Sequence, residues 1–122
     1  MTIKEYQKQT GRTNAPLDDE YNDLTSIHML MGMMTEVGEL TDQFKKNLAY
    51  GKDIDWVNVK EEIGDLMWYV SEFANQHNFD LEEILETNIG KLQKRFPEKF
   101  TSEHAINRNV DNERKFLEML EG

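Results

Sequence analysis

Apolar residues recur at steps of three and four over long stretches of this chain, which is the spacing of helices with one buried face. The two prolines, Pro16 and Pro97, fall in breaks between these stretches. Alternating strand patterns and Asn-Gly or Asp-Gly turns are absent from the sequence. Helices without a sheet must bury their apolar stripes against each other, so we predict an all-α fold, a helical bundle of four to five helices.

Capping and turn residues indicate where the helices begin and end. Asp55 and Asp80 precede apolar stretches as N-caps, and Glu83 follows Asp80 at the spacing of a capping box. Gly51 is the natural stop of the longest stretch. The predicted helices cover residues 3–10, 22–49, 56–77, 81–96 and 112–120.

The second and third of these helices carry the longest apolar stripes, and we expect both stripes to face the core. The stripe of the third helix consists of Val59, Ile63, Leu66, Val70 and Phe73. The stripe of the second helix consists of Leu24, Ile27, Leu30, Met34, Val37, Leu40, Phe44 and Leu48. The methionines of the second helix are interpreted as core filling, because Met packs irregular gaps well.

Size and composition limit the class of protein. We expect a single domain over residues 1–122, with 101–122 as a C-terminal extension that docks on the domain or on a neighbouring subunit. The sequence has no cysteine and no apolar signal segment, so we expect a cytoplasmic protein without a membrane partner. The net charge of -10 argues against binding to a nucleic-acid polymer. Asp18 and Asp19 are interpreted as a solvated loop.

Two carboxylates of the third helix lie toward its apolar side rather than on the solvated side. At about 100° per residue, Glu62 falls roughly 20° beyond one edge of the stripe and Asp65 about 60° further around. Tyr69 lies between them. Glu61 and Glu72 fall on the side away from the stripe, where we expect water to solvate them.

The second helix carries a matching pair, because Glu36 and Glu39 stand three residues apart and share one face. His28, Gly32 and Lys46 lie on the same face, and Gly32 leaves room for a close approach. Two such pairs on antiparallel neighbours would bring four carboxylates together, which is unfavourable unless protons or cations neutralise them. Oxygen ligands without Cys or His favour Mg²⁺, or Mn²⁺, over Zn²⁺.

The fourth helix places Asn88, Lys91 and Arg95 along one edge of its apolar stripe. Cationic groups beside a metal and carboxylate cluster suit the non-bridging oxygens of a polyphosphate. An alternative interpretation stays open, because carboxylates at three-residue spacing are more often only a solvated helix face.

Two segments, EVGEL at 36–40 and EIGDLMWY at 62–69, together resemble the paired helix motifs of the MazG-like nucleotide pyrophosphohydrolases. NIGKLQKRFPEKF at 88–100 is similar to the family's downstream Asn, Lys and Arg stretch, and the EYQ and RT of the N-terminal region are similar to short members. Many members have a further Glu where this chain has Thr35, so the number of bound metals stays open. The resemblance implies the all-α NTP pyrophosphatase fold and a homodimer or homotetramer.

The resemblance also implies an enzymatic function. The family's metal ligands carry over to Glu36, Glu39, Glu62 and Asp65, and the reaction is Mg²⁺-dependent hydrolysis of a nucleoside triphosphate, here expected to be a deoxynucleotide, to the monophosphate and pyrophosphate. One of the glutamates could serve as the proton acceptor. The residues expected to contact the small-molecule nucleotide are Lys46, Tyr69, Asn88, Lys91 and Arg95.

Three alternatives can be compared with this function. A phosphoribosyl-ATP pyrophosphatase would share the fold and the chemistry, so substrate assays must separate the two. A non-catalytic nucleotide-binding or regulatory module on the same bundle would show no turnover with Mg²⁺. A di-iron carboxylate bundle would need a His three residues after the motif glutamates, and the sequence has none there.

Overall fold

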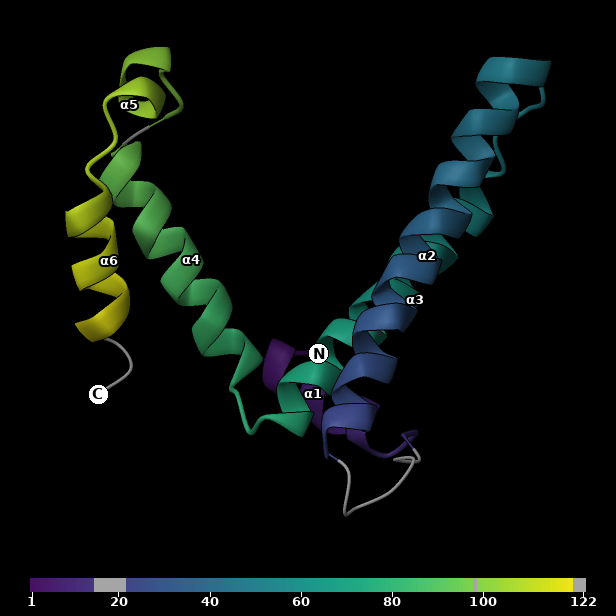
Figure 1. The fold of residues 1–122 in the computed structure, drawn as a ribbon, viewed down its shortest axis with the longest axis horizontal. Coiled ribbons are helices and arrows are strands. Elements are labelled where there is room, and N and C mark those ends of the chain that lie inside the picture. The colour runs from purple at the N-terminus through teal and green to yellow at the C-terminus, as the bar shows by residue number, and fades with distance from the viewer. Residues whose placement is uncertain (15–21, 98, 120–122) are drawn as a thin grey trace. The chain divides into compact units, whose positions relative to one another are not determined.

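The computed structural model describes residues 1–14, 22–97 and 99–119, and these residues form helices without any strand (Figure 1). The all-α prediction is confirmed. The helices are α1 (Ile3–Gly11), α2 (Asn22–Tyr50), α3 (Trp56–Gln76), α4 (Leu81–Arg95), α5 (Ser102–Ile106) and α6 (Val110–Met119). None of these described helices is long and apolar enough to cross a membrane.

The helix ends follow the predicted caps closely. The Asp55 side chain accepts hydrogen bonds from the backbone N–H groups of Val57 and Asn58, and that of Asp80 accepts one from Glu83. Gly51 follows α2 with a φ of 65°, a left-handed conformation that glycine adopts without strain. Four of the predicted helices are therefore present with ends shifted by at most one residue.

The segment after Pro97 differs more from the prediction. Its residues 102–106 form a short helix, α5, where the sequence pattern indicated only a polar connection. The Thr101 hydroxyl caps this helix by accepting from the His104 N–H at 3.1 Å. The last helix begins two residues earlier than predicted, and Asn109 accepts from the Asn112 N–H at 3.0 Å in its first turn. The predicted end of this helix at Leu120 lies outside the described residues, as do Asp18 and Asp19.

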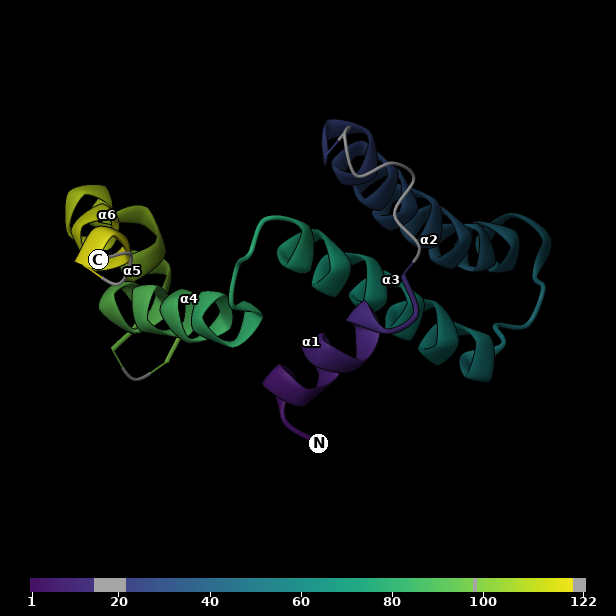
Figure 2. The ribbon, with the colours of Figure 1, turned by 90° about the horizontal axis from the view of Figure 1, so that it is seen from below.

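The chain divides into two compact units, Met1–Phe79 and Asp80–Gly122. In the first unit α2 and α3 form an antiparallel pair (Figure 2). The contacts along this pair follow nearly one register: Gln43 bonds to Asn58, the Tyr69 ring lies against Gly32, and Ser26 bonds to His77. The same register places the motif glutamates of α2 opposite the motif carboxylates of α3.

Helix α1 packs on another flank of α3 through polar contacts. The hydroxyls of Thr10 and Ser71 are buried and lie 2.7 Å apart. The Gln7 Nε2 donates to the Asn75 Oδ1 at 2.8 Å, and the Asn75 Nδ2 donates back to the Gln7 carbonyl at 3.0 Å. Because buried polar groups need partners, these reciprocal hydrogen bonds fix where α1 lies along α3.

The predicted apolar stripe of α2 is not the face that contacts α3. Thr25 and Met29 are buried against the rest of the unit, whereas Ile27, Met34 and Leu48 of the stripe are 50%, 75% and 89% exposed. The expectation that α2 packs with its stripe inward is wrong for this pair. Small residues explain the choice of face, since Gly32 and Thr25 allow α3 to approach closely. The stripe is left as a broad apolar surface along α2.

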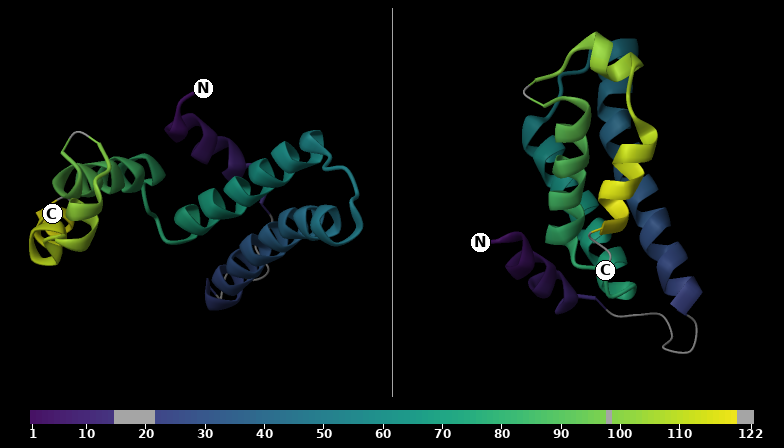
Figure 3. Two further views of the ribbon diagram at one scale, coloured as in Figure 1. Left: turned by 90° about the horizontal axis from the view of Figure 1, so that it is seen from above. Right: turned by 90° about the vertical axis from the view of Figure 1, so that its left-hand side faces the viewer.

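In the second unit α6 packs along α4 (Figure 3). The Phe116 ring lies against Gly90, where an added Cβ would be only 2.3 Å from it. Glu113 is 3% exposed and accepts from Arg95 at 2.8 and 3.1 Å and from Arg108 at 2.6 Å. These two guanidinium groups lower the pKa of the Glu113 carboxyl to about 2.

Candidate metal site

The α2 and α3 pair brings the motif carboxylates of the two helices together. One ligand oxygen from each of Glu36, Glu62 and Asp65 lies within 4.8 Å of the others. Glu39 is one turn along α2 from Glu36 and is close enough to Glu62 for the two carboxyls to affect each other's protonation. All four motif residues are thus gathered at one place between the helices. We call the group Glu36, Glu39, Glu62 and Asp65 the carboxylate cluster.

Crowding and partial burial make the carboxylate cluster electrostatically unfavourable by itself. Glu36 is half-buried, but Glu39 and Asp65 are exposed, so the expectation that Asp65 is turned inward like Glu62 is wrong. Glu62 is 7% exposed, and the Oε2 atoms of Glu36 and Glu62 are buried with no hydrogen-bond partner among the described residues. The nearby Glu36 carboxyl, followed by burial, raises the pKa of Glu62. Glu62 in turn raises the pKa of Glu39. Crowded carboxyls of this kind need either protons or a cation.

The donor set fits a hard divalent cation. The cluster offers only carboxylate oxygens, which Mg²⁺ and Mn²⁺ prefer over the nitrogen and sulfur ligands typical of Zn²⁺. Two oxygens on opposite sides of a Mg²⁺ ion are about 4.2 Å apart. One oxygen from each of Glu36, Glu62 and Asp65 lies within 4.8 Å of the others, so small side-chain rotations would bring them to the spacing that such an ion requires. The two buried oxygens without partners are the atoms that a cation would satisfy.

Tyr69 lies one turn beyond Asp65 on α3 and fills the space left by Gly32. A Cβ added at Gly32 would be 2.2 to 2.5 Å from atoms of the Tyr69 ring. The room that this glycine was expected to leave is thus occupied by a residue of the chain itself. The ring also meets His28 at a centroid distance of 6.4 Å and Trp68 at 5.1 Å, both edge to face. Tyr69 is held in place on three sides.

Two of the cationic residues predicted to bind phosphates are engaged by carboxylates of their own unit. The Lys46 ammonium lies 2.8 Å from Asp42, a carboxylate on its own helix. Arg95 is engaged by Glu113 in the second unit. Lys91 is half-buried and Asn88 is exposed, both on α4. Their approach to the nucleotide stays a prediction.

Glu72 was expected to be solvated, and this expectation is wrong. Glu72 is 2% exposed, because α1 covers the flank of α3 that carries it. The Asn14 Nδ2 donates to one carboxylate oxygen at 2.7 Å and the Asn75 Nδ2 to the other at 2.9 Å. The helical spacing of Gln7 and Thr10 on α1 was the available sign that this helix has a polar inner face, and Asn14 follows just beyond its end.

A second set of residues that the sequence did not reveal supports Glu62. The Asn58 Nδ2 donates to the Glu62 Oε1 at 3.4 Å, and Gln43 donates to Asn58. Asn58 stands four residues before Glu62, a spacing that allows contact on one helix face. Gln43 could be linked to them only once the register between α2 and α3 was known.

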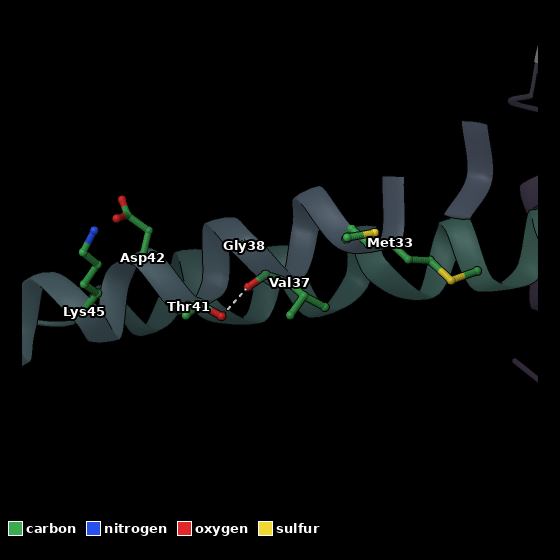
Figure 4. Close-up of a pocket in the computed structure, with 7 residues that line it drawn as sticks. Met33, Val37, Gly38, Thr41, Asp42 and Lys45 are labelled. Atoms are coloured by element: carbon green, nitrogen blue, oxygen red, sulfur yellow. Dashed lines mark hydrogen bonds between the residues drawn. The ribbon is translucent and has the colours of Figure 1, made fainter. Parts of the chain in front are cut away.

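An open groove with a volume of about 550 Å³ lies on the outer face of α2 (Figure 4). Its lining includes Met33, Met34, Val37 and Thr41. Val37 and Thr41 are joined by a hydrogen bond from the Thr41 hydroxyl to the Val37 carbonyl at 2.7 Å. Val37 and Met34 belong to the exposed apolar stripe, so the groove is part of that surface and not of the carboxylate cluster.

Comparison with known proteins agrees with this geometry. The family model described as the MazG nucleotide pyrophosphohydrolase domain matches residues 24–100, which include the whole carboxylate cluster. The gene 37 protein of Mycobacterium phage L5 is 37% identical over 75 residues, covering 56% of this chain and 63% of that protein. The chain thus spans somewhat less than two thirds of the length of this relative. No solved structure matches. With the match over most of its length, the chain belongs to the MazG nucleotide pyrophosphohydrolase family.

Proposed function

We propose that this chain hydrolyses a nucleoside triphosphate, specifically a deoxynucleotide, to the monophosphate and pyrophosphate in a Mg²⁺-dependent reaction. The observation that carries the proposal is the carboxylate cluster, in which buried oxygens of Glu36 and Glu62 have no partner among the described residues. Membership of the family supports pyrophosphohydrolase chemistry in general. To this general chemistry the proposal adds a deoxynucleotide as the substrate and Mg²⁺ as the metal.

One set of residues would bind the cation and another set the substrate. Glu36, Glu39, Glu62 and Asp65 would hold Mg²⁺. When bound, Mg²⁺ supplies neutralisation of phosphate charge and activation of water. A glutamate of the cluster accepts the proton of the attacking water.

The remaining proposed site residues contact the nucleotide. Lys91 and Arg95 offset the charge of the phosphates, and Lys46 assists them. Tyr69 and Asn88 donate hydrogen bonds. Arg95 must exchange its contact with Glu113 for a phosphate to act in this way, since Glu113 occupies its guanidinium by two hydrogen bonds.

The activity can be tested with a panel of ribo- and deoxyribonucleoside triphosphates, assayed for pyrophosphate release with and without Mg²⁺. We expect release from at least one deoxynucleotide in the presence of Mg²⁺ and none after chelation. Release of orthophosphate instead of pyrophosphate would contradict the proposed bond cleavage. No turnover of any triphosphate would favour a non-catalytic module.

Addition of Mg²⁺ or Mn²⁺ to the metal-free protein should raise its melting temperature, because a ligand that binds only the folded state stabilises it. The gain is about 2.7 kcal/mol at a metal concentration 100 times the dissociation constant. Asp65→Asn should remove most of this gain, since it takes one charged oxygen from the cluster. The measurement is thermal unfolding followed by circular dichroism. An undiminished shift in Asp65→Asn would exclude Asp65 as a ligand.

We propose further that the chain forms a homodimer or homotetramer through the exposed stripe of α2. Apolar patches of this extent on a helix face are typical of surfaces that pack against another subunit. Trp56, at 61% exposure, lies near the end of the same pair of helices. Light scattering at micromolar concentration should give a dimer or larger, and Val37→Glu should shift the protein toward the monomer. A monomeric wild-type protein would contradict this proposal.

A further inference from the structure

A chain of side-chain amides ends on one oxygen of Glu62. The backbone N–H of Asp55 donates to the Gln43 Oε1 at 3.0 Å. The Gln43 Nε2 donates to the Asn58 Oδ1, and the Asn58 Nδ2 donates to the Glu62 Oε1 at 3.4 Å. The chain crosses from the loop before α3 to α2 and back to α3. Both amide side chains belong to half-buried residues.

The direction of this chain is determined at its start. A backbone N–H can only donate, so Gln43 must turn its oxygen toward Asp55 and its nitrogen toward Asn58. Asn58 must then accept with its oxygen and present its own nitrogen to Glu62. The carboxylate at the end therefore meets a donor and not an acceptor. The Asp55 N–H thus determines the donor and acceptor direction of both amide side chains, and with it the group that meets Glu62.

The effect at Glu62 is to distinguish its two oxygens. The Oε1 has the Asn58 donor, while the Oε2 is buried and has no partner among the described residues. A hydrogen bond to one oxygen limits the rotation of the carboxylate and leaves the other oxygen for a ligand. We propose that Gln43 and Asn58 are positioning residues that hold Glu62 ready for the divalent cation. The inference rests on the metal site of the proposed function.

The decisive variant is Gln43→Glu, which replaces the amide nitrogen of residue 43 by an oxygen. Residue 43 does not contact Glu62 directly but is linked to it through Asn58. The new carboxylate still accepts from the Asp55 N–H, but it cannot donate to Asn58. Asn58 then rotates its nitrogen toward residue 43 and turns its oxygen toward the Glu62 Oε1, where two oxygens repel each other. We call the hydrogen-bonded chain from Asp55 through Gln43 and Asn58 to Glu62 the relay. An added negative charge alone would tighten cation binding, whereas a broken relay would weaken it, so the two explanations predict opposite changes in affinity.

The readout is Mn²⁺ binding to the nucleotide-free protein, titrated by electron paramagnetic resonance. Gln43→Glu and Asn58→Ala should each weaken Mn²⁺ binding about tenfold or more, the lower end of the effects known for partners of metal ligands. In the double variant, Gln43→Glu should cause no further loss, because it acts only through Asn58. Circular dichroism and metal-free melting curves establish that the variants are folded.

A matched control is Gln9→Glu. Gln9 is exposed on α1, and its oxygen accepts from Arg12, a contact that glutamate retains. This variant adds the same charge with the same chemistry and should leave Mn²⁺ affinity within about twofold. Affinity in Gln43→Glu equal to or tighter than that of the wild type would overturn the relay. The relay would also be overturned if the losses of Mn²⁺ affinity from Gln43→Glu and Asn58→Ala were additive in the double variant.

The relay and the metal site can fail separately. If the wild type does not bind Mn²⁺ and Asp65→Asn makes no difference, the metal site of the proposed function fails and the relay fails with it. If the wild type binds Mn²⁺, Asp65→Asn loses it and Gln43→Glu does not, only the relay is wrong.

Discussion

Glu62→Gln is expected to lower pyrophosphate release by about 100-fold or more, whereas Glu61→Gln is expected to leave it nearly unchanged. The two residues are neighbours with the same chemistry and differ in where α3 directs them. Glu62 is buried within the carboxylate cluster beside Glu36, and Glu61 is exposed. Replacing Glu62 by its amide removes a charged oxygen that Mg²⁺ prefers. A solvated position such as Glu61 should change stability by no more than about 0.5 kcal/mol.

The comparison should be made at saturating Mg²⁺ with the best nucleotide of the panel, after circular dichroism shows that both variants remain helical. Glu61 is the matched control, since both substitutions remove one carboxylate from adjacent positions of one helix. Greater damage from Glu61→Gln would mean that the ligand assignment on α3 fails. Equal damage from both would point to the charge of the segment and not to a metal ligand.

The helices could be predicted from the sequence because their ends depend on local chemistry. Asp55 and Asp80 cap α3 and α4 in the structure through their own side chains, as their sequence context indicates. Gly51 follows α2 for an equally local reason. α5 is capped by the Thr101 hydroxyl and is only five residues long, so it leaves no periodic pattern to detect.

Angular position around a helix predicted the burial of Glu62 but not that of Glu72. Angular position predicts burial only where the apolar stripe is the one covered side of a helix. α3 is covered on a second flank by α1, whose contacts there include the polar side chains of Gln7 and Thr10. Glu72 is buried there with two amide donors. A polar interface carries no hydrophobic signal, so periodicity cannot reveal it.

The apolar stripe of α2 shows a second limit of predictions from helical periodicity. Periodicity identified an apolar face correctly, but it could not say which neighbour that face would meet. The α3 contact uses the face of Thr25, Met29 and Gly32, where the motif glutamates also lie. α2 carries carboxylates on one face and an apolar stripe on another. The apolar stripe gives the stronger signal in the sequence, but it need not be the face that contacts the neighbouring helix.

The residues around the carboxylate cluster were predictable only in part. Glu36, Glu39, Glu62 and Asp65 stand at spacings that indicate convergence on one point. Hydrogen-bond partners that these residues find on the opposite helix cannot be deduced from spacing along one helix. Gln43 reaches Asn58 because of the register between α2 and α3. Contacts between helices depend on this register, which the sequence pattern leaves undetermined.

Gly32→Ala is expected to destabilise the protein by about 1–3 kcal/mol, although alanine is the better helix former. The added Cβ would be 2.2 Å from the Tyr69 ring, a distance that requires the ring or the helix to move. His28 and Trp68 contact the same ring edge to face, so its movement disturbs them as well. The measurement is chemical unfolding followed by circular dichroism.

Gly64→Ala is the matched control on the partner helix α3, because no atom lies within 4 Å of the Cβ it would add and it stands outside the α2 stripe. It should stabilise the protein by up to about 1 kcal/mol through helix propensity. Removing the ring tests the cause directly: in a Tyr69→Ala background the space is open, and Gly32→Ala should lose most of its penalty. If the penalty persists without the ring, Gly32 is needed for a reason other than the approach of Tyr69. If Gly32→Ala instead stabilises the protein as Gly64→Ala does, the close packing of α2 on α3 at this point is wrong, and the register that places Glu36 opposite Asp65 is wrong with it.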